Sequence, residues 1–274
     1  MAIILRPGQE TGMKHDKDFG GQLREWRQRR RMSQFDLAAE ADLSTRHLSF
    51  VETGRAKPSR EMVQRLSEAL ELPLRSRNSL LIAAGFAPSY PERAFETSST
   101  ARELVQRILD CHMPFPALAV DRHWHLVASN AAVPALMAGA SPALREPPAN
   151  VLRLSLHPDG LAPRIANLAD WKRHILERLR HQASESGDPV LEELAEELRA
   201  YPAPASKTPA QATGEVPIAV PLVFDSPIGQ LSFLSTTTVF GTPAEVTLSE
   251  LAIESFFPAN PETGERLRQM SGIS

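Results

Sequence analysis

Residues 45 to 50 contain side chains that are suited to contacting the edges of nucleic-acid bases. Thr45, Arg46, Ser49 and Phe50 fall on the outward side of a short predicted helix. The guanidinium of Arg46 can pair with both hydrogen-bond acceptors of a guanine, and small hydroxyl groups can contact a base edge or a phosphate. The ring of Phe50 can pack on a thymine methyl group or fold back onto the core. For Arg46 the alternatives are a phosphate contact or simple solvation, but the set as a whole predicts a helix that contacts DNA bases.

Polar and basic residues that are suited to phosphate contacts surround this helix. A basic loop follows Gly54, and other candidates lie at helix starts, where exposed N–H groups favour anions. The predicted phosphate contacts are Arg24, Gln34, Ser44, Arg55 and Lys57. Such contacts position a protein on a duplex without specifying the base sequence.

Two short helices joined by a tight turn, residues 41–43, must position these side chains. Ser33 and Ser44 can each cap a helix, because a serine hydroxyl accepts a hydrogen bond from an unpaired N–H group in the first turn. The apolar positions that lock the crossing of the two helices are Leu37, Ala38, Leu48 and Val51. Further helices are predicted over 19–31, 59–70 and 74–84. The pattern therefore predicts an all-α helix-turn-helix domain of five short helices over residues 18–86.

This order of helices resembles the lambda-repressor-like, XRE-type helix-turn-helix domain. The resemblance rests on Gln34 at the start of a helix, on the small Ala38, and on the Glu-x-Gly ending at Glu52 and Gly54. It implies DNA binding, and it implies that an arginine of the first helix, Arg27, meets Glu52.

The charge of the chain is divided unevenly between its two parts. Residues 1–88 hold 15 Lys and Arg against 11 Asp and Glu, a net charge of +4, whereas the remainder holds 15 against 22, a net charge of −7. This asymmetry predicts that only the front part binds nucleic acid. Residues 1–17 are polar and without a pattern, which predicts a flexible N-terminal arm.

The cysteine count and the apolar runs indicate the compartment. Cys111 is the single cysteine, which excludes an intrachain disulfide and fits a reducing environment. The apolar run at 2–5 is too short for the core of a signal peptide, and no run is long enough to span a membrane. We therefore expect a cytoplasmic protein that makes no membrane contact.

A second domain follows a break in the helical pattern at Pro88 and Pro91, which predicts a linker over 87–99 and a domain over 100–270. The predicted elements are a helix at 100–113, strands at 117–121 and 124–129, helices at 168–183 and 189–201, a surface loop at 202–215, and strands at 216–224, 228–240 and 248–257. This order predicts an α+β, PAS-like fold with helices on one face of an antiparallel sheet.

The same region resembles the ligand-binding domain of MmyB-like transcription regulators. The resemblance rests on short motifs in a fixed order: Pro116–Asp121, Ala128–Asn130, Asn150–Arg153, Trp171, Leu179 with Arg180, Phe240–Pro243, Glu250 with Leu251, and Phe256–Pro258. It implies a PAS-like cavity that holds a small, largely apolar ligand, which is fatty-acid-like in some members.

Apolar side chains are expected to line the gap between the sheet and its helices. The predicted lining residues are Trp124, Leu136, Leu154, Trp171, Ile175, Phe224, Phe233 and Phe240. The alternative is a filled core without a ligand. Arg153 or Arg180 can hold a carboxylate head group if the ligand is an acid, but either can equally be a surface or salt-bridge residue.

No pattern of residues indicates a metal, a cofactor or an enzyme. His123 and His125 share a strand face, and His174 and His181 lie two turns apart on one helix, but structural or solvent-exposed histidines explain both pairs. The chain has no Gly-rich phosphate loop, serine elbow or paired catalytic acids, so no catalytic residue is predicted.

These patterns together predict a transcription regulator that binds a double-stranded DNA operator and senses a small apolar ligand, with a fatty acid as one candidate. A single recognition helix reads few base pairs, so we expect a homodimer on a palindrome with half-sites ~34 Å apart. Two alternatives stay open: a second domain that only dimerises or binds a protein partner, and an enzyme fused to a DNA-binding module. The sequence does not identify the ligand, the operator, or the choice between repression and activation.

Overall fold

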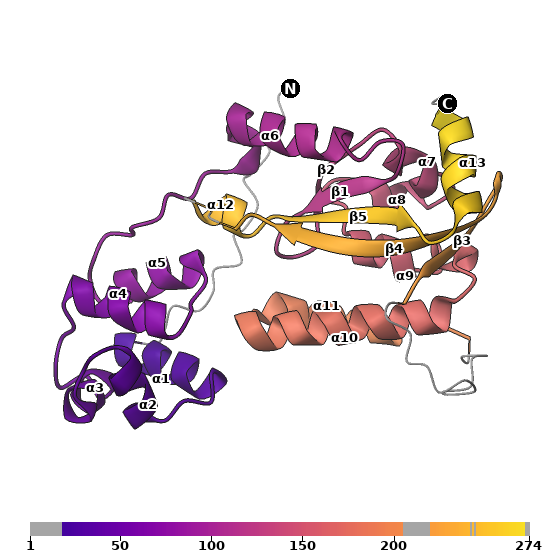
Figure 1. The fold of residues 1–274 in the computed structure, drawn as a ribbon. Coiled ribbons are helices and arrows are strands. Elements are labelled where there is room, and N and C mark those ends of the chain that lie inside the picture. The colour runs from indigo at the N-terminus through magenta and orange to yellow at the C-terminus, as the bar shows by residue number, and fades with distance from the viewer. Residues whose placement is uncertain (1–17, 205–219, 242, 244, 272–274) are drawn as a thin grey trace, which may run out of the picture. The chain divides into compact units, whose positions relative to one another are not determined.

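The computed structural model describes residues 18–204, 220–241, 243 and 245–271, and the chain divides into two compact units, 1–91 and 92–274 (Figure 1). The predicted N-terminal arm, most of the predicted loop at 202–215, and the start of the strand expected at 216–224 lie outside the described residues.

The first unit contains five short helices, as the sequence predicts. They are α1 (Phe19–Arg29), α2 (Gln34–Glu40), α3 (Thr45–Glu52), α4 (Arg60–Ala69) and α5 (Leu74–Ala83). The serine hydroxyls cap three of them as expected: Ser33 accepts from the N–H of Asp36, Ser44 from that of His47, and Ser59 from that of Met62. Asp36 accepts in turn from the N–H of Ser33, which completes a capping box at the start of α2.

Buried apolar side chains fix the crossing of α2 and α3. Leu37, Ala38, Leu48 and Val51 are all buried in the core of the first unit. Each fully buried leucine contributes about 1.5–3 kcal/mol relative to an exposed one. Helix α1 packs directly against α3 through Gly20, where an added Cβ atom would lie 2.4 Å from the carbonyl oxygen of Glu52. Only glycine permits this approach.

The segment predicted as a linker, 87–99, is divided between the two units. The side-chain oxygen of Asn78 on α5 accepts hydrogen bonds from the N–H groups of Ser89 and Tyr90, and its amide donates to the carbonyl of Tyr90. In the second unit, the carbonyl of Arg93 accepts from the Thr247 hydroxyl. Residues of the segment on each side of the division are therefore attached to the unit to which they belong.

The second unit is built on a five-stranded antiparallel sheet in the order β2-β1-β5-β4-β3 (Figure 1). The strands are β1 (Ala117–Val120), β2 (Leu126–Ser129), β3 (Leu222–Ser226), β4 (Gly229–Val239) and β5 (Ala252–Pro258). The α-helices are α6 (Ser99–Asp110), α7 (Val133–Met137), α8 (Pro142–Arg145), α9 (Val151–Leu156), α10 (Leu168–Ser186), α11 (Pro189–Ala200), α12 (Val246–Ser249) and α13 (Pro261–Ser271), with 3-10 turns at Phe95–Thr97 and Ala162–Arg164.

The α+β fold class is confirmed, but helices cover both faces of the sheet rather than the single face that was expected. Leu118 and Val120 of β1 face the core formed with α9, α10 and α11. Ala117 and Ala119 point to the opposite face and pack with Val105 and Leu109 of α6. Because β1 is buried along its whole length, each of its two faces needs a covering layer.

The C-terminal part differs from the expectation in two further ways. Strand β5 begins at Ala252 rather than at residue 248, because α12 occupies 246–249. Helix α13 was not expected. Its Leu267 is fully buried against Leu231 and Phe233 of β4, and the Thr263 hydroxyl accepts from the N–H of Ser232.

Candidate functional site

The outward side of α3 presents the side chains that were expected to contact bases. Thr45 and Arg46 are exposed, and Ser49 and Phe50 are half-buried. The guanidinium carbon of Arg46 lies 5.4 Å from the centre of the Phe50 ring, within the range of a cation–π contact. Phe50 therefore has a local role that sequence reasoning did not anticipate, since its ring supports the exposed arginine.

A buried carboxylate holds the end of α3 in place. Glu52 has no exposed side-chain surface, and its two oxygens accept from Arg27 of α1, Nε–Oε1 at 2.7 Å and Nη2–Oε2 at 3.1 Å. Burial by itself raises the pKa of the Glu52 carboxyl, but the hydrogen bonds from Arg27 and Gln34 and the charge of Arg27 outweigh it, so the pKa lies below its ordinary value. Glu52 is thus ionised at neutral pH and joins three helices.

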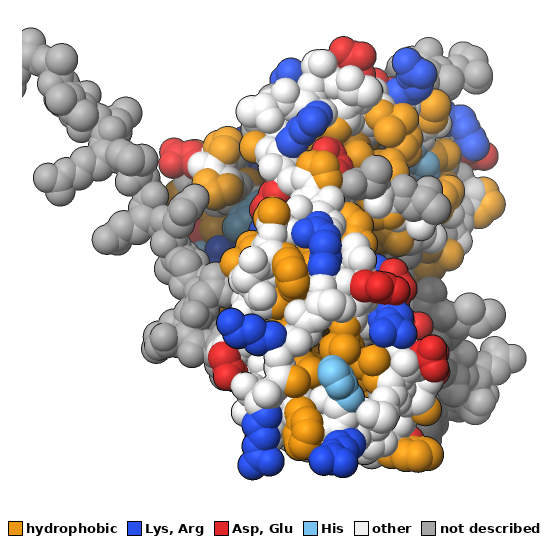
Figure 2. Space-filling model, turned by 90° about the vertical axis from the view of Figure 1, so that its left-hand side faces the viewer, with side chains coloured by type: hydrophobic (Ala, Val, Ile, Leu, Met, Phe, Trp, Pro, Cys, Tyr) orange, Lys and Arg blue, Asp and Glu red, His pale blue; other side chains and the backbone are white. Residues whose placement is uncertain are grey.

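The residues predicted to contact phosphates fall into two groups. Arg55 and Lys57 are exposed in the loop after Gly54, whose φ of 71° is the left-handed conformation that glycine adopts readily. The polar groups of the others have partners within the unit: Gln34 donates to Glu52, Ser44 caps α3, and the half-exposed Arg24 has its Nε 3.6 Å from Glu52. Basic side chains are visible on the surface of this unit in Figure 2.

The predicted pocket residues of the second unit are distributed over more than one cluster. Trp124, Trp171, Ile175 and Phe224 belong to one core between the sheet and α9–α11, and Leu136 packs against it. Leu154 is buried, and Phe233 lies in the neighbouring cluster with Leu231 and Leu267. Phe240 instead packs on the opposite face, against the α6 cluster. Odd-numbered positions of β4 such as Phe233 and Thr237 face the α10 side, so the strand alternation directs position 240 to the other face.

The two arginines proposed for a ligand head group do not point into this core as free cations. Arg153 forms a bidentate ion pair with Glu197, Nε–Oε1 at 2.8 Å and Nη2–Oε2 at 2.7 Å, and Tyr201 donates to the same carboxylate. Burial and this hydrogen bond raise the pKa of Tyr201 to about 12. Arg180 is exposed on α10.

A third arginine, which sequence reasoning missed, reaches the sheet. Arg178 of α10 pairs with the buried Glu254 of β5 at 2.5 Å, and its guanidinium lies 4.5 Å from the Trp124 ring centre. The Thr237 hydroxyl also bonds Glu254. A signal was present in the sequence, because residue 178 continues the inward spacing of Trp171 and Ile175 on α10.

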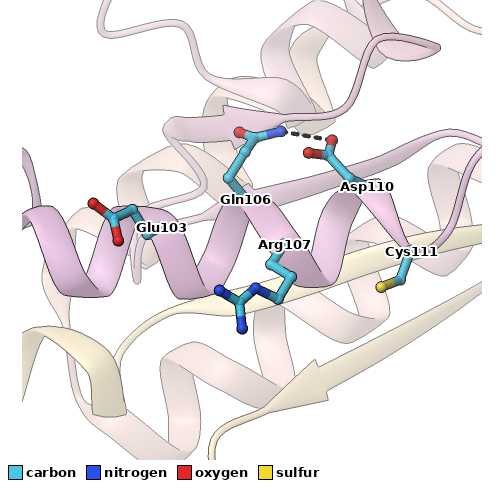
Figure 3. Close-up of a pocket in the computed structure, with 5 residues that line it drawn as sticks. All are labelled: Glu103, Gln106, Arg107, Asp110 and Cys111. Atoms are coloured by element: carbon cyan, nitrogen blue, oxygen red, sulfur yellow. Dashed lines mark hydrogen bonds between the residues drawn. The ribbon is translucent and has the colours of Figure 1, made fainter.

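A large open hollow lies elsewhere, on the outer side of α6. It has a volume of about 560 Å³ and is lined by Glu103, Gln106, Arg107, Asp110 and Cys111 (Figure 3). Charged and amide side chains surround it, and Gln106 turns toward Asp110 and β2, where its amide donates to the carbonyl of Ser129. This surface is unlike the apolar gap that was expected to hold a ligand.

His123 and His125 were expected on a strand face, but they lie in the turn before β2, which begins at Leu126, and there they join Asp121 in a cluster of possible metal ligands. The ligand atoms of Asp121, His123 and His125 lie within 4.8 Å of one another. Burial raises the pKa of the Asp121 carboxyl, but hydrogen bonds from His125 and from backbone N–H groups lower it by more, so it lies below its ordinary value.

The comparisons with known proteins agree with both units. Residues 18–80 match a helix-turn-helix domain, and residues 101–270 match the MmyB-like transcription regulator ligand binding domain. No curated relative matches the chain. Among the helices that the structure describes, none is both long and apolar enough to cross a bilayer.

The fold and the two matches define a DNA-binding transcription regulator with a ligand-binding domain. Because the larger match covers more than half of the chain, the protein belongs to the family of MmyB-like transcription regulators.

Proposed function

We propose that this regulator binds a specific operator as a homodimer in the cytoplasm and that a small, largely apolar ligand of fatty-acid type changes its affinity for DNA. The exposed Arg46, supported by Phe50 on α3, is the observation that carries the DNA-binding part. A guanidinium fork in the major groove pairs with guanine and contributes about 1–3 kcal/mol of discrimination. The exposed Arg55 and Lys57 supply nearby phosphate contacts.

The apolar layer between the sheet and α9–α11 supports the choice of ligand. Trp124, Trp171, Ile175 and Phe224 supply large apolar surfaces in one core. The ion pair that reaches this layer, Arg178 with Glu254, carries no net charge. A ligand that enters between these elements therefore meets apolar surface without a net charge, which favours a hydrocarbon chain.

The outer side of α6 supports the dimer. Leu104 and Ile108 are 43% and 37% exposed, although both are large and apolar. They lie on the side of α6 that is nearer to β5 than to β2. On the sheet, Phe257 of β5 and Leu234 of β4 form an exposed cross-strand pair. The His112 ring at the end of α6 lies 4.6 Å from that of Phe257. The patch is thus continuous from the helix to the sheet.

Charges beside this patch are arranged so that a second copy of the chain can complement them. A two-fold axis perpendicular to α6 near residues 105–106 sets Leu104 opposite Ile108 of the second copy. The same axis sets Glu103 opposite Arg107 of the second copy, and the reciprocal pair forms by symmetry. An isologous interface requires such self-complementarity. We therefore propose that a second copy covers this patch.

Selection of bound sequences from a random duplex library by the full chain tests the proposed function. The selected duplex should contain two inverted half-sites and bind at least about 10³-fold more tightly than its shuffled sequence. Equal affinity for selected and shuffled duplexes would contradict sequence-specific binding. A selected site with a single half-site would contradict the dimer.

A further inference from the structure

Three side chains of metal-ligand type converge on the hairpin between β1 and β2. One ligand atom each from Asp121, His123 and His125 lies within 4.8 Å of the other two. In a tetrahedral zinc site, with metal–ligand bonds of about 2.0–2.1 Å, neighbouring ligand atoms are roughly 3.4 Å apart. Rotamer adjustments of about an ångström would therefore bring these groups to coordinating distance.

Hydrogen bonds within the hairpin aim the Asp121 carboxylate. Its Oδ1 accepts from the backbone N–H of His123 at 2.9 Å and of His125 at 2.8 Å. Its Oδ2 lies 3.0 Å from Nδ1 of His125. The turn thus fixes one oxygen and leaves the other beside an imidazole nitrogen. A cation can bridge this pair of atoms in place of the shared proton.

A fourth residue orients His123. Nε2 of His123 lies 2.8 Å from Oδ2 of Asp188, and Oδ1 of Asp188 accepts from the N–H of Val190 at the start of α11. Because Asp188 engages Nε2, the nitrogen of His123 that is left for a cation is Nδ1. A carboxylate behind a ligating histidine is the usual arrangement in metal sites, where it fixes the tautomer and raises the basicity of the ligand.

The residue between the two histidines keeps them together. Trp124 is 4% exposed, its indole N–H donates to Gln182 of α10, and its φ of 67° turns the backbone between its neighbours. The carbonyl of His123 accepts from the Asn150 amide at 2.8 Å. The indole is thus held in the core while both imidazoles stay at the partly exposed cluster, so the site is largely organised before a cation binds.

We infer that Asp121, His123 and His125 bind a divalent transition-metal cation of the zinc class, with Asp188 positioning His123. Two imidazole nitrogens and one carboxylate oxygen suit Zn²⁺ and its neighbours Co²⁺ and Ni²⁺, whereas Mg²⁺ and Ca²⁺ prefer all-oxygen sites. Three protein ligands leave a position for water. The bound cation would join the β1–β2 hairpin, through His123 and Asp188, to the start of α11.

Metal titration of the full, tag-free chain tests this inference. Isothermal titration should show about one Zn²⁺ per chain, and Co²⁺ should give the visible absorption of a low-coordinate nitrogen and oxygen site. His125→Ala and Asp121→Asn should abolish this binding, and Asp188→Asn should weaken it by roughly 10–100-fold. Circular dichroism of each metal-free variant establishes that it is folded.

Two control variants separate this site from adventitious binding. His181 lies 3.4 Å from Glu185 in an exposed pair on α10, so His181→Ala should leave the titration unchanged. Cys111→Ser removes the exposed thiol and should also leave it unchanged. The inference is overturned if the wild-type chain binds no Zn²⁺, if folded His125→Ala binds as tightly as wild type, or if Cys111→Ser loses the binding. In those cases the histidines serve only as hydrogen-bonding groups of the hairpin.

Discussion

Gln34 Nε2 donates a 2.7 Å hydrogen bond to Oε2 of Glu52, so the first residue of α2 is tied directly to the last residue of α3. Oε2 also accepts from Arg27 of α1. The angle at which α3 is presented therefore depends on a polar contact as well as on the packing of Leu37 and Leu48. This bond uses one of the two N–H donors of the Gln34 amide, so Gln34 can position α3 and still donate to a phosphate.

Loss of the Glu52 carboxylate should destabilise the first unit. Arg27 is only 12% exposed, and Glu52→Gln leaves this cation without its counter-ion. Removal of one partner of a buried pair costs about 3–5 kcal/mol. Thermal unfolding of the full chain should show a lower transition for the first unit. Glu25→Gln is the matched control, because Glu25 pairs with Arg29 at the surface, where such an i,i+4 pair contributes about 0.2–0.5 kcal/mol.

The ionisation of Glu52 also makes the stability of the first unit depend on pH in the acid range. The folded-state pKa of Glu52 lies below its ordinary value of 4.5, so its stabilisation is complete above about pH 4.5 and is lost as the pH falls through the folded-state pKa. Unfolding measured between neutral pH and pH 3 should therefore show a steeper loss for wild type than for Glu52→Gln. Parallel pH profiles of the two proteins would contradict this account.

Arg46 and Lys57 should differ in the kind of affinity that they contribute. Arg46→Ala should weaken binding to the selected operator by about 1–3 kcal/mol and relax its specificity, because a base contact is lost. Lys57→Ala should weaken binding to all duplexes similarly and reduce the salt slope by about one. Binding to operator and shuffled DNA across salt concentrations separates the two effects. If Arg46→Ala leaves the ratio of the two affinities unchanged, α3 does not read bases through this residue.

Sequence alone predicts the first unit well because its determinants are local. The caps at Ser33, Ser44 and Ser59 and the spacing of buried residues lie within one or two turns of the positions that they fix. In the second unit, the periodic patterns located the strands and the long helices. Helix α13 was not expected, because the attachment of Leu267 to β4 depends on residues more than thirty positions away.

The polar contacts of the second unit could not be predicted for the same reason. Arg178 meets Glu254 across 76 positions of the chain, and Arg153 meets Glu197 across 44. Charge and spacing identify the candidates, but they do not say which carboxylate each arginine meets. His123 and His125 were interpreted as structural residues because two histidines on one strand face are common. The contact that distinguishes this cluster is between His123 and Asp188, which lie 65 positions apart in the chain.

Charge reversal on α6 should control dimerisation. Glu103→Arg sets two arginines opposite each other in both symmetric pairs, and Arg107→Glu sets two glutamates opposite each other. Like charges in contact oppose association by several kcal/mol, so each single variant should raise the dimer Kd by at least about tenfold. Sedimentation equilibrium at low salt measures this change.

A mixture of the two variants provides the decisive control. An equimolar mixture of Glu103→Arg and Arg107→Glu restores opposite charges in both pairs, so native mass spectrometry should detect the heterodimer preferentially. Effects within a single helix cannot produce this rescue. Arg102→Glu changes an exposed residue on another side of α6 and should leave the dimer unaffected. Failure of the mixture to associate, or equal weakening by Arg102→Glu, would exclude this surface as the dimer contact.

A ligand with a hydrocarbon chain should stabilise the second unit and alter operator binding. A ligand at a hundredfold excess over its Kd adds about 2.7 kcal/mol to the free energy of unfolding, which corresponds to roughly 5–10 °C for a domain of this size. A thermal-shift series should compare fatty acids with alcohols and methyl esters of equal chain length. Because Arg178 is neutralised by Glu254 and Arg153 by Glu197, we expect the chain length to matter more than the carboxylate.

Regulation requires a second measurement on the same compounds. A ligand shifts the balance between states of high and low DNA affinity only by the difference in its affinities for them. A compound that raises the unfolding temperature should therefore also change the Kd of the full chain for its operator, whereas an analogue that causes no thermal shift should not. Stabilisation without any change in operator affinity would restrict the ligand to a structural role. If no compound of the series shifts the unfolding temperature, the apolar layer between the sheet and α9–α11 is a filled core, and the second unit acts through dimerisation alone.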